Sequence, residues 1–145
     1  QNYVVAARWF RMAADQGDPA AQYNLGTMYY KGQGVPHDQS ESIRWFRKAA
    51  DQGTYAAQYE LGEMYFRGKG APQDTMEAYK WVSLAAFIVS GDEWRKYLKS
   101  NAITPQMIED ARQLYTKVRN SLSTQLTAQQ IAEAQRFVRE WKPKQ

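Results

Sequence analysis

The sequence repeats itself at a constant offset, and this repetition limits the possible folds more than any other feature. The segment from Gly17 to Ala50 is followed by a second copy that begins at Gly53, so the offset is 36 residues. Identical residues recur through both copies, among them the pairs Gln22/Gln58, Leu25/Leu61, Gly26/Gly62, Pro36/Pro72 and Trp45/Trp81. A constant offset of about 20 to 50 residues is typical of a stacked repeat array. The sequence therefore predicts a solenoid.

Each copy carries the signals of two helices. In the first copy, Asp18 offers an N-cap and Pro19 stands at the first helical position, where its missing N–H costs nothing. A glycine- and proline-containing break at 32–36 separates this helix from the next. Asp38 and Glu41 have the spacing of a capping box, which indicates where the second helix begins. Each copy therefore predicts a pair of antiparallel helices, and the predicted fold class is all-α.

Three tryptophans share one position of the repeat. Trp9, Trp45 and Trp81 are separated by the same offset as the rest of the pattern. A large apolar side chain that recurs in this way is expected to fill the space between helices. We therefore assign all three tryptophans to the core.

The motifs of each copy resemble those of a known repeat family. Residues 21–29 read Ala-Gln-Tyr-x-Leu-Gly-x-Met-Tyr, residues 32–38 read Gly-x-Gly-Val-Pro-x-Asp, and residues 45–53 read Trp-Phe-Arg-Lys-Ala-Ala-Asp-Gln-Gly. This combination resembles the Sel-1-like repeat (SLR), a relative of the tetratricopeptide repeat. The resemblance covers residues 1–90 as a half repeat (1–16) and two repeats (17–52 and 53–90). It implies a right-handed α/α solenoid, a bacterial source and a chain cut from a longer array.

Residues 91–145 depart from the repeat and are expected to form a C-terminal cap of helices. Thr104-Pro105 opens a helix that is expected to end near Arg119, with a loop at 120–125. Thr127 and Gln130 predict a capping box for the last helix. Residues from Lys142 onward are expected to fray. Because a repeat stack exposes an apolar face at each end, a terminal element that covers this face is physically expected.

Composition and charge exclude several classes of protein. The chain has a net charge of +4, and residues 91–145 supply all of it, with ten Lys/Arg against six Asp/Glu. No dense Lys/Arg cluster predicts a nucleic-acid site, and no apolar run is long enough to predict a membrane span. The absence of cysteine excludes disulfides and thiolate metal sites.

No set of residues predicts catalysis. His37 is the only histidine, and it falls in a loop where a solvated side chain is expected. The glycine loops at 32–34 and 68–70 lack the Gly-Lys-Ser/Thr of a phosphate loop, and each follows a helix C-terminus, whose dipole disfavours anions. The paired carboxylates stand at helix starts, where capping explains them. The sequence therefore predicts a protein that is not an enzyme and binds no metal and no cofactor.

The first helix of each pair offers a candidate binding surface. By analogy with tetratricopeptide repeats, these helices line the concave face of a solenoid. Some positions off the buried stripe differ between the copies, whereas the packing positions do not; they are Asn24, Thr27, Lys31, Glu60, Glu63 and Arg67. The aromatic residues Tyr23 and Tyr59, with Tyr30 and Phe66, fall nearer the outer face. The same pattern is also typical of an ordinary solvated helix face.

The sequence thus predicts a non-enzymatic scaffold that binds a protein or peptide partner on this concave face. We expect no nucleic-acid partner, and we expect a monomer. Three alternatives stay open: an envelope- or cell-wall-associated protein or hydrolase-like family member, a structural spacer in a longer array, and oligomerisation through the basic C-terminal helices. The compartment is open between the bacterial periplasm or secretion and the cytoplasm.

Overall fold

The computed structural model describes residues 2–92, 94–97 and 102–144, which form helices and no strand. The all-α prediction is confirmed. In chain order the helices are α1 (Tyr3–Asp15), α2 (Pro19–Lys31), α3 (Gln39–Asp51), α4 (Tyr55–Arg67), α5 (Thr75–Ser90), α6 (Trp94–Tyr97), α7 (Pro105–Ser123) and α8 (Ala128–Glu140). The repeat sequence therefore appears as two helix pairs, α2–α3 and α4–α5, preceded by α1.

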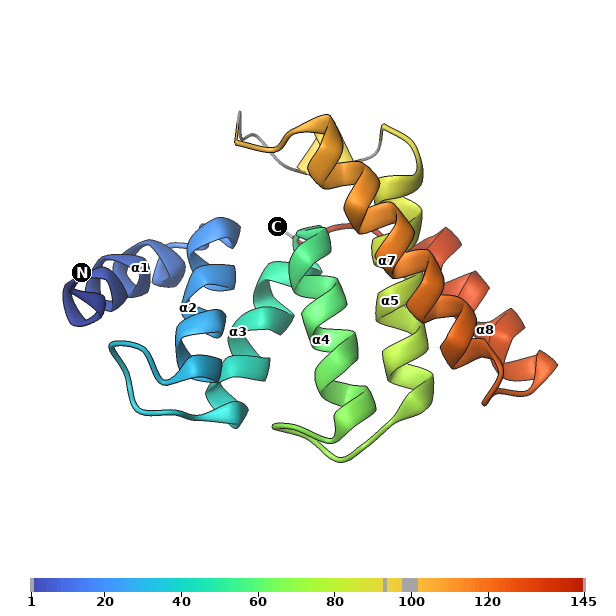
Figure 1. Cartoon of the computed structure of the whole chain (residues 1–145), viewed down its shortest axis with the longest axis horizontal. Helices are drawn as coiled ribbons and strands as arrows, with labels where there is room; N and C mark the ends of the chain where they lie inside the picture. The colour runs from blue at the N-terminus through green and yellow to red at the C-terminus, as the bar shows by residue number, and fades with distance from the viewer. Residues whose placement is uncertain (1, 93, 98–101, 145) are drawn as a thin grey trace.

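The helices stack along the long axis of the molecule (Figure 1). From α1 to α5, each helix packs on the next one in the chain, and α7 and α8 then pack on α5. In Figure 1, α2, α4 and α7 lie in front, while α3, α5 and α8 lie behind. The first helices of the pairs thus share one side of the molecule, as the solenoid prediction requires.

Side chains cap the helix starts as the sequence predicts. The carboxylate of Asp38 accepts from the backbone N–H of Glu41 at 3.0 Å, and Asp74 accepts from Glu77 at the same distance. The reciprocal bond of a full capping box is present at Thr127, whose backbone N–H donates to Gln130 Oε1 at 2.9 Å. At these three helix starts a side chain therefore satisfies a backbone N–H that has no partner within its own helix, whereas the N-cap of α4, Thr54, makes no such bond.

The assignment of Trp9 to the core is wrong. Trp45 and Trp81 are 2% and 4% exposed, but Trp9 is 65% exposed. Trp45 packs against Ala14 and Leu25, which belong to the two helices before it. Trp45 is thus covered by helices that precede it in the stack. No described helix precedes α1, so the shared position does not bury Trp9.

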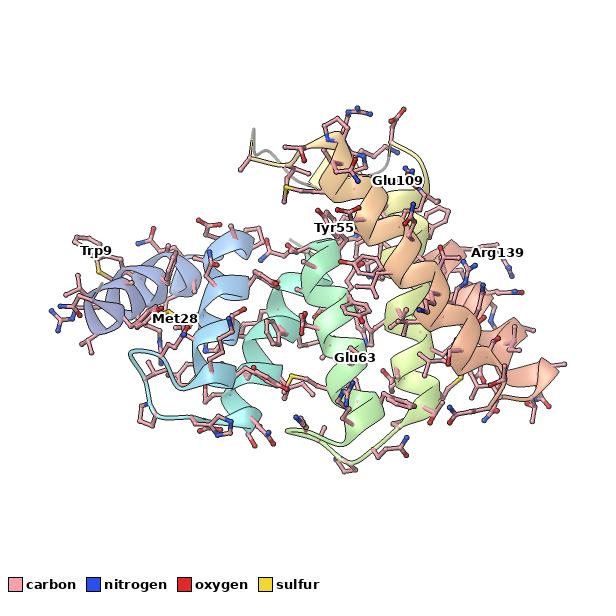
Figure 2. The ribbon with its side chains drawn as sticks, in the orientation of Figure 1. Trp9, Met28, Tyr55, Glu63, Glu109 and Arg139 are labelled. Atoms are coloured by element: carbon pink, nitrogen blue, oxygen red, sulfur yellow. The ribbon has the colours of Figure 1, made fainter. Side chains whose placement is uncertain are left out.

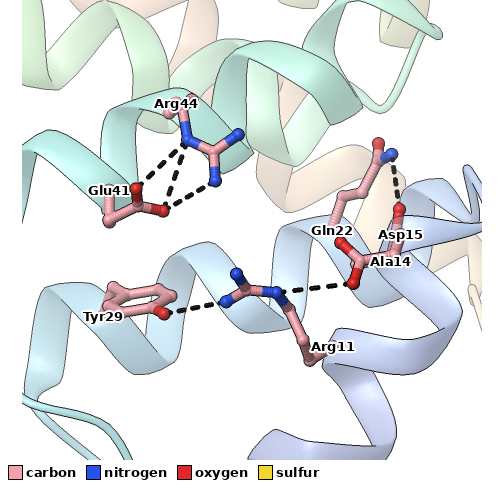
Figure 3. Close-up of polar contacts among 7 residues, drawn as sticks. All are labelled: Arg11, Ala14, Asp15, Gln22, Tyr29, Glu41 and Arg44. Atoms are coloured by element: carbon pink, nitrogen blue, oxygen red, sulfur yellow. Dashed lines mark hydrogen bonds and ion pairs between the residues drawn. The ribbon is translucent and has the colours of Figure 1, made fainter.

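An arginine from two helices earlier in the chain covers each buried tryptophan. The Arg11 guanidinium lies 5.5 Å from the ring centre of Trp45, and Arg47 lies 5.3 Å from that of Trp81. Arg11 also donates to Tyr29 Oη at 3.0 Å (Figure 3). These contacts join one helix pair to the next and recur at the repeat offset.

Two other sequence predictions are corrected at the C-terminal end. Helix α7 runs on to Ser123 rather than ending near Arg119, and Leu122 in its last turn is buried. The segment after Lys142 is held rather than frayed, because the Lys144 backbone N–H donates to the carbonyl of Asp51 at 2.7 Å. The chain therefore returns from α8 to the end of α3 (Figure 1).

The two glycines inside the first helices of the pairs permit close helix contact. A Cβ built on Gly26 would lie 2.8 Å from the Phe46 ring, and one built on Gly62 would lie 2.7 Å from Val82 Cγ2. Such distances are shorter than van der Waals contact, so any larger residue forces the facing side chain or its helix to shift. Helix packing thus explains why glycine occupies this position in both copies of the repeat.

We predict that Gly62→Ala destabilises the protein by about 1–3 kcal/mol, the usual cost of overpacking a core. The facing atoms include the Ala78 carbonyl oxygen at 3.1 Å, which belongs to helix backbone and cannot swing aside. Urea unfolding followed by circular dichroism measures the change. A matched Gly91→Ala variant, where an added Cβ meets nothing within 4 Å, serves as the control.

The tryptophans supply a second prediction. Trp81→Ala is expected to lower the free energy of unfolding by about 3–5 kcal/mol, because it removes a buried aromatic side chain. Trp9→Ala is expected to change it by less than about 0.5 kcal/mol, as for exposed positions in general. Urea titrations measure both changes. If the two substitutions lower the free energy of unfolding equally, the conclusion that Trp81 is buried and Trp9 is exposed is wrong.

Candidate functional site

The predicted binding residues of α4 line a hollow of about 340 Å³ on the side of the molecule that α2 and α4 share. Tyr59, Glu60, Glu63 and Arg67 all contribute to its wall. Their positions follow from the helix period, because residues three or four apart lie on one face. Figure 2 labels Glu63 on this helix.

The α2 residues of the prediction lie at different distances from this hollow. Lys31 is close enough to Glu60 for their charges to interact, and the charge of Glu60 in turn contributes to a raised pKa of Tyr23. Thr27 is occupied within its own helix, where its hydroxyl donates to the Tyr23 carbonyl at 3.1 Å. Asn24 is half-buried and does not line the hollow.

Three further residues line the hollow: Tyr30, Met64 and Lys69. The helix pattern places Tyr30 near the outer face, whereas Met64 and Lys69 are not among the binding residues predicted from the sequence. Lys69 Nζ donates to Tyr30 Oη at 3.1 Å and lies 5.4 Å from the centre of that ring. In the sequence, the glycines on either side of Lys69 indicate a loop, and this loop places the Lys69 side chain against Tyr30 of α2.

The two glutamates of the hollow differ in their pairing. Glu63 Oε2 lies 3.3 Å from Arg67 Nε, so its charge is compensated. Glu60 has no hydrogen bond or ion pair with any described residue. Burial raises the pKa of the Glu60 carboxyl, the nearby charge of Glu63 raises it further, and Lys31 opposes this shift. The hollow thus contains one half-buried carboxylate without a partner.

Aromatic packing holds the tyrosines of this surface in place. The ring of Tyr59 stacks on Tyr115 of α7, with 4.6 Å between ring centres. Burial, with smaller contributions from Glu63 and Glu60, raises the pKa of Tyr59 to about 12. The Tyr23 ring lies 5.6 Å from that of Phe46, and burial raises the pKa of Tyr23 as well. Both phenols therefore stay neutral at neutral pH and offer flat, fixed surfaces to a ligand.

The described residues do not gather into a cluster of metal ligands. In the part of the chain that the structure describes, no three His, Asp or Glu side chains gather to hold a metal ion. His37, the only histidine, is exposed in its loop. None of the described helices is long and apolar enough to cross a bilayer.

The unpaired carboxylate leads to a prediction on pH. Glu60 has a pKa above its ordinary value of 4.5, so the folded protein holds this proton where the unfolded chain has lost it. Protonated Glu60 therefore stabilises the folded protein fully at pH values below 4.5. This stabilisation is lost as the pH rises through the raised pKa of Glu60. Glu60→Gln is therefore expected to increase the melting temperature at pH 7, and this gain should vanish near pH 4. A gain that is the same at both pH values would contradict the prediction.

Comparison with known proteins identifies the repeat. The family model described as "Sel1 repeat" matches residues 1–18, 19–54 and 56–86, which is more than half of the chain. Among curated proteins, the ERAD-associated E3 ubiquitin-protein ligase component HRD3B of Arabidopsis thaliana is 50% identical over 38 residues. That match covers 26% of this chain and 6% of the plant protein.

Two solved structures are similar to the whole chain or to much of it. One is c5321, described as a protective antigen present in uropathogenic Escherichia coli strains and displaying an SLR fold; it is 32% identical, with a TM-score of 0.76 over 97% of this chain. The other is a Sel1 repeat protein from Oxalobacter formigenes, 39% identical, with a TM-score of 0.58 over 64% of this chain. The chain spans about a quarter of the length of each, 26% and 27%.

These matches confirm the resemblance that the 36-residue motifs indicated and the solenoid that it implied. Sel1 repeat proteins typically mediate protein–protein interactions, and scaffolds of this kind are generally non-catalytic. By the extent of the family match, the chain belongs to the Sel1 repeat family.

Proposed function

We propose that this chain is a non-enzymatic scaffold that binds a segment of a protein or peptide along the side shared by α2 and α4. The observation that carries the proposal is the hollow of α4, where a half-buried carboxylate stands beside aromatic rings. Hollows with fixed aromatic walls and a few polar groups are suited to ligand recognition. The interaction function of the family agrees with this proposal.

The chemistry of the hollow favours a cationic side chain on the partner. Glu60 is near the charge of Lys31 but forms no ion pair with a described residue, and a Lys or Arg side chain from a bound peptide would supply one. The rings of Tyr59 and Tyr30 add surfaces on which a cation is attracted to the aromatic face. Lys69 already places its ammonium group over the ring of Tyr30, so a cation can reach an aromatic face in this hollow.

The repeat pattern supports the same surface. The positions that differ between the copies include Asn24/Glu60, Thr27/Glu63 and Lys31/Arg67, whereas the neighbouring leucines and glycines are identical. A scaffold keeps its packing positions and varies the positions that face a partner. We propose that the eight predicted residues, with Tyr30, Met64 and Lys69, form one contact surface.

The proposal predicts that a fourfold charge reversal, Lys31→Glu with Glu60→Lys, Glu63→Lys and Arg67→Glu, abolishes capture of cationic peptides. The assay is an array of immobilised peptides that carry either one Arg or one Glu in an otherwise constant sequence. Wild-type protein is expected to retain the Arg series at least tenfold better than the Glu series. The reversed variant is expected to lose this preference.

The matched control reverses an exposed pair on α3, Glu41→Lys with Arg44→Glu, whose partners are 2.8 Å apart. Like the fourfold variant, it leaves net charge unchanged, but it alters a different helix. Retention of the preference by this control and its loss in the fourfold variant support the proposed surface. If the fourfold variant binds as the wild type does, the assignment of this surface is wrong.

A further inference from the structure

A second hollow lies at the C-terminal end of the molecule, outside the proposed partner-binding surface. It has a volume of about 560 Å³ and is open to solvent on one side. Helices α7 and α8 both pack on α5 but make much less contact with each other. They come together beside the 124–127 connection and leave a wedge between them, with α5 as its floor.

The wall of this hollow carries positive charge without a balancing acid. Arg119 of α7 and Arg139 of α8 both line it, and none of its lining residues is Asp or Glu. Neither arginine forms an ion pair within the described part of the chain. Arg119 donates only to the amide oxygen of Asn120, at 3.3 and 3.4 Å. Figure 2 labels Arg139 on α8.

The floor of the hollow is apolar, with one unsatisfied hydroxyl. Phe87 of α5 is 50% exposed, although it follows a buried stretch of that helix. Ser83, one turn earlier, is 8% exposed, and its Oγ has no hydrogen-bond partner among the described residues. A buried hydroxyl without a partner is unfavourable, so a bound acceptor here would be stabilised. The site thus combines guanidinium groups, an apolar surface and a hydroxyl that lacks a partner.

We infer that this hollow binds the carboxyl terminus of a peptide whose last residue is apolar. Arg side chains recognise carboxylates through paired N–H groups, and Arg119 and Arg139 approach the hollow from two sides. The last residue of a peptide carries its carboxylate and its side chain on one Cα, so the charge can meet the arginines while the side chain covers Phe87. The amides of Asn120 and Gln135 also line the hollow and can bond to the peptide backbone.

The alternative anion is a phosphate, which arginines also bind. A phosphate would use the two guanidinium groups but would leave the apolar floor uncovered. The carboxyl terminus of a peptide uses both features, and the openness of the hollow lets the rest of the peptide leave to solvent. The observations therefore favour the peptide, and phosphate becomes a competitor in the test.

The test measures binding of a fluorescent hexapeptide that ends in leucine, either as the free acid or as the amide, to the intact chain. The free acid is expected to bind at least tenfold more tightly than the amide. The double substitution Arg119→Gln with Arg139→Gln is expected to remove this difference. Phe87→Ala is expected to remove the preference for leucine over a terminal glycine while the free acid keeps its advantage over the amide.

Arg136→Gln is the matched control, because it removes one positive charge from α8 but Arg136 does not line the hollow. It should change affinity less than twofold, and melting curves verify that every variant is folded. Equal binding of acid and amide, no binding of either, or an equal loss in the control overturns the inference. Displacement of the peptide by inorganic phosphate at the peptide's own concentration overturns it as well. The fourfold reversal on α2 and α4 is expected to leave this binding intact, which separates the two proposals.

Discussion

Close contact between the paired helices is the constraint on which the rest of this structure depends. Gly26 faces Phe46 and Gly62 faces Val82 at distances that no larger residue permits. In the first pair, the buried Ser42 adds a hydrogen bond from its hydroxyl to the Gly26 carbonyl at 2.7 Å. The helix spacing set here decides which side chains of the pair reach the neighbouring pair.

The contact between successive pairs depends on a second recurring set. Arg47 of α3 donates to Tyr65 Oη of α4 at 2.5 Å and lies over Trp81 of α5, so one side chain joins three helices. Arg11 makes the same two contacts with residues one repeat earlier. A cation over an aromatic face contributes about 0.5–1 kcal/mol at exposed sites and more when desolvated. Because these contacts recur at the repeat offset, each one links a helix pair to the preceding part of the stack in the same way.

The repeat, its helix starts and most of its core could be predicted from sequence, because each rests on local spacing. The exposure of Trp9 could not be predicted, because burial at this repeat position depends on a neighbouring helix in the stack. The return of Lys144 to Asp51 is a long-range contact with no local signal. In the candidate site, the helix period correctly grouped Tyr59, Glu60, Glu63 and Arg67. It missed Lys69, which reaches the site from a loop.

The two hollows differ in the charges of their walls for a structural reason. In a repeat stack, the packing positions are held by the recurring pattern, and the remaining positions of each helix are free to vary without a large cost in stability. On α4 this freedom leaves a carboxylate without a partner at Glu60. At the C-terminal end, two helices that follow no repeat leave Arg119 and Arg139 around an apolar floor. Because the two sites share no lining residue, a change that alters the ligand of one need not disturb the other.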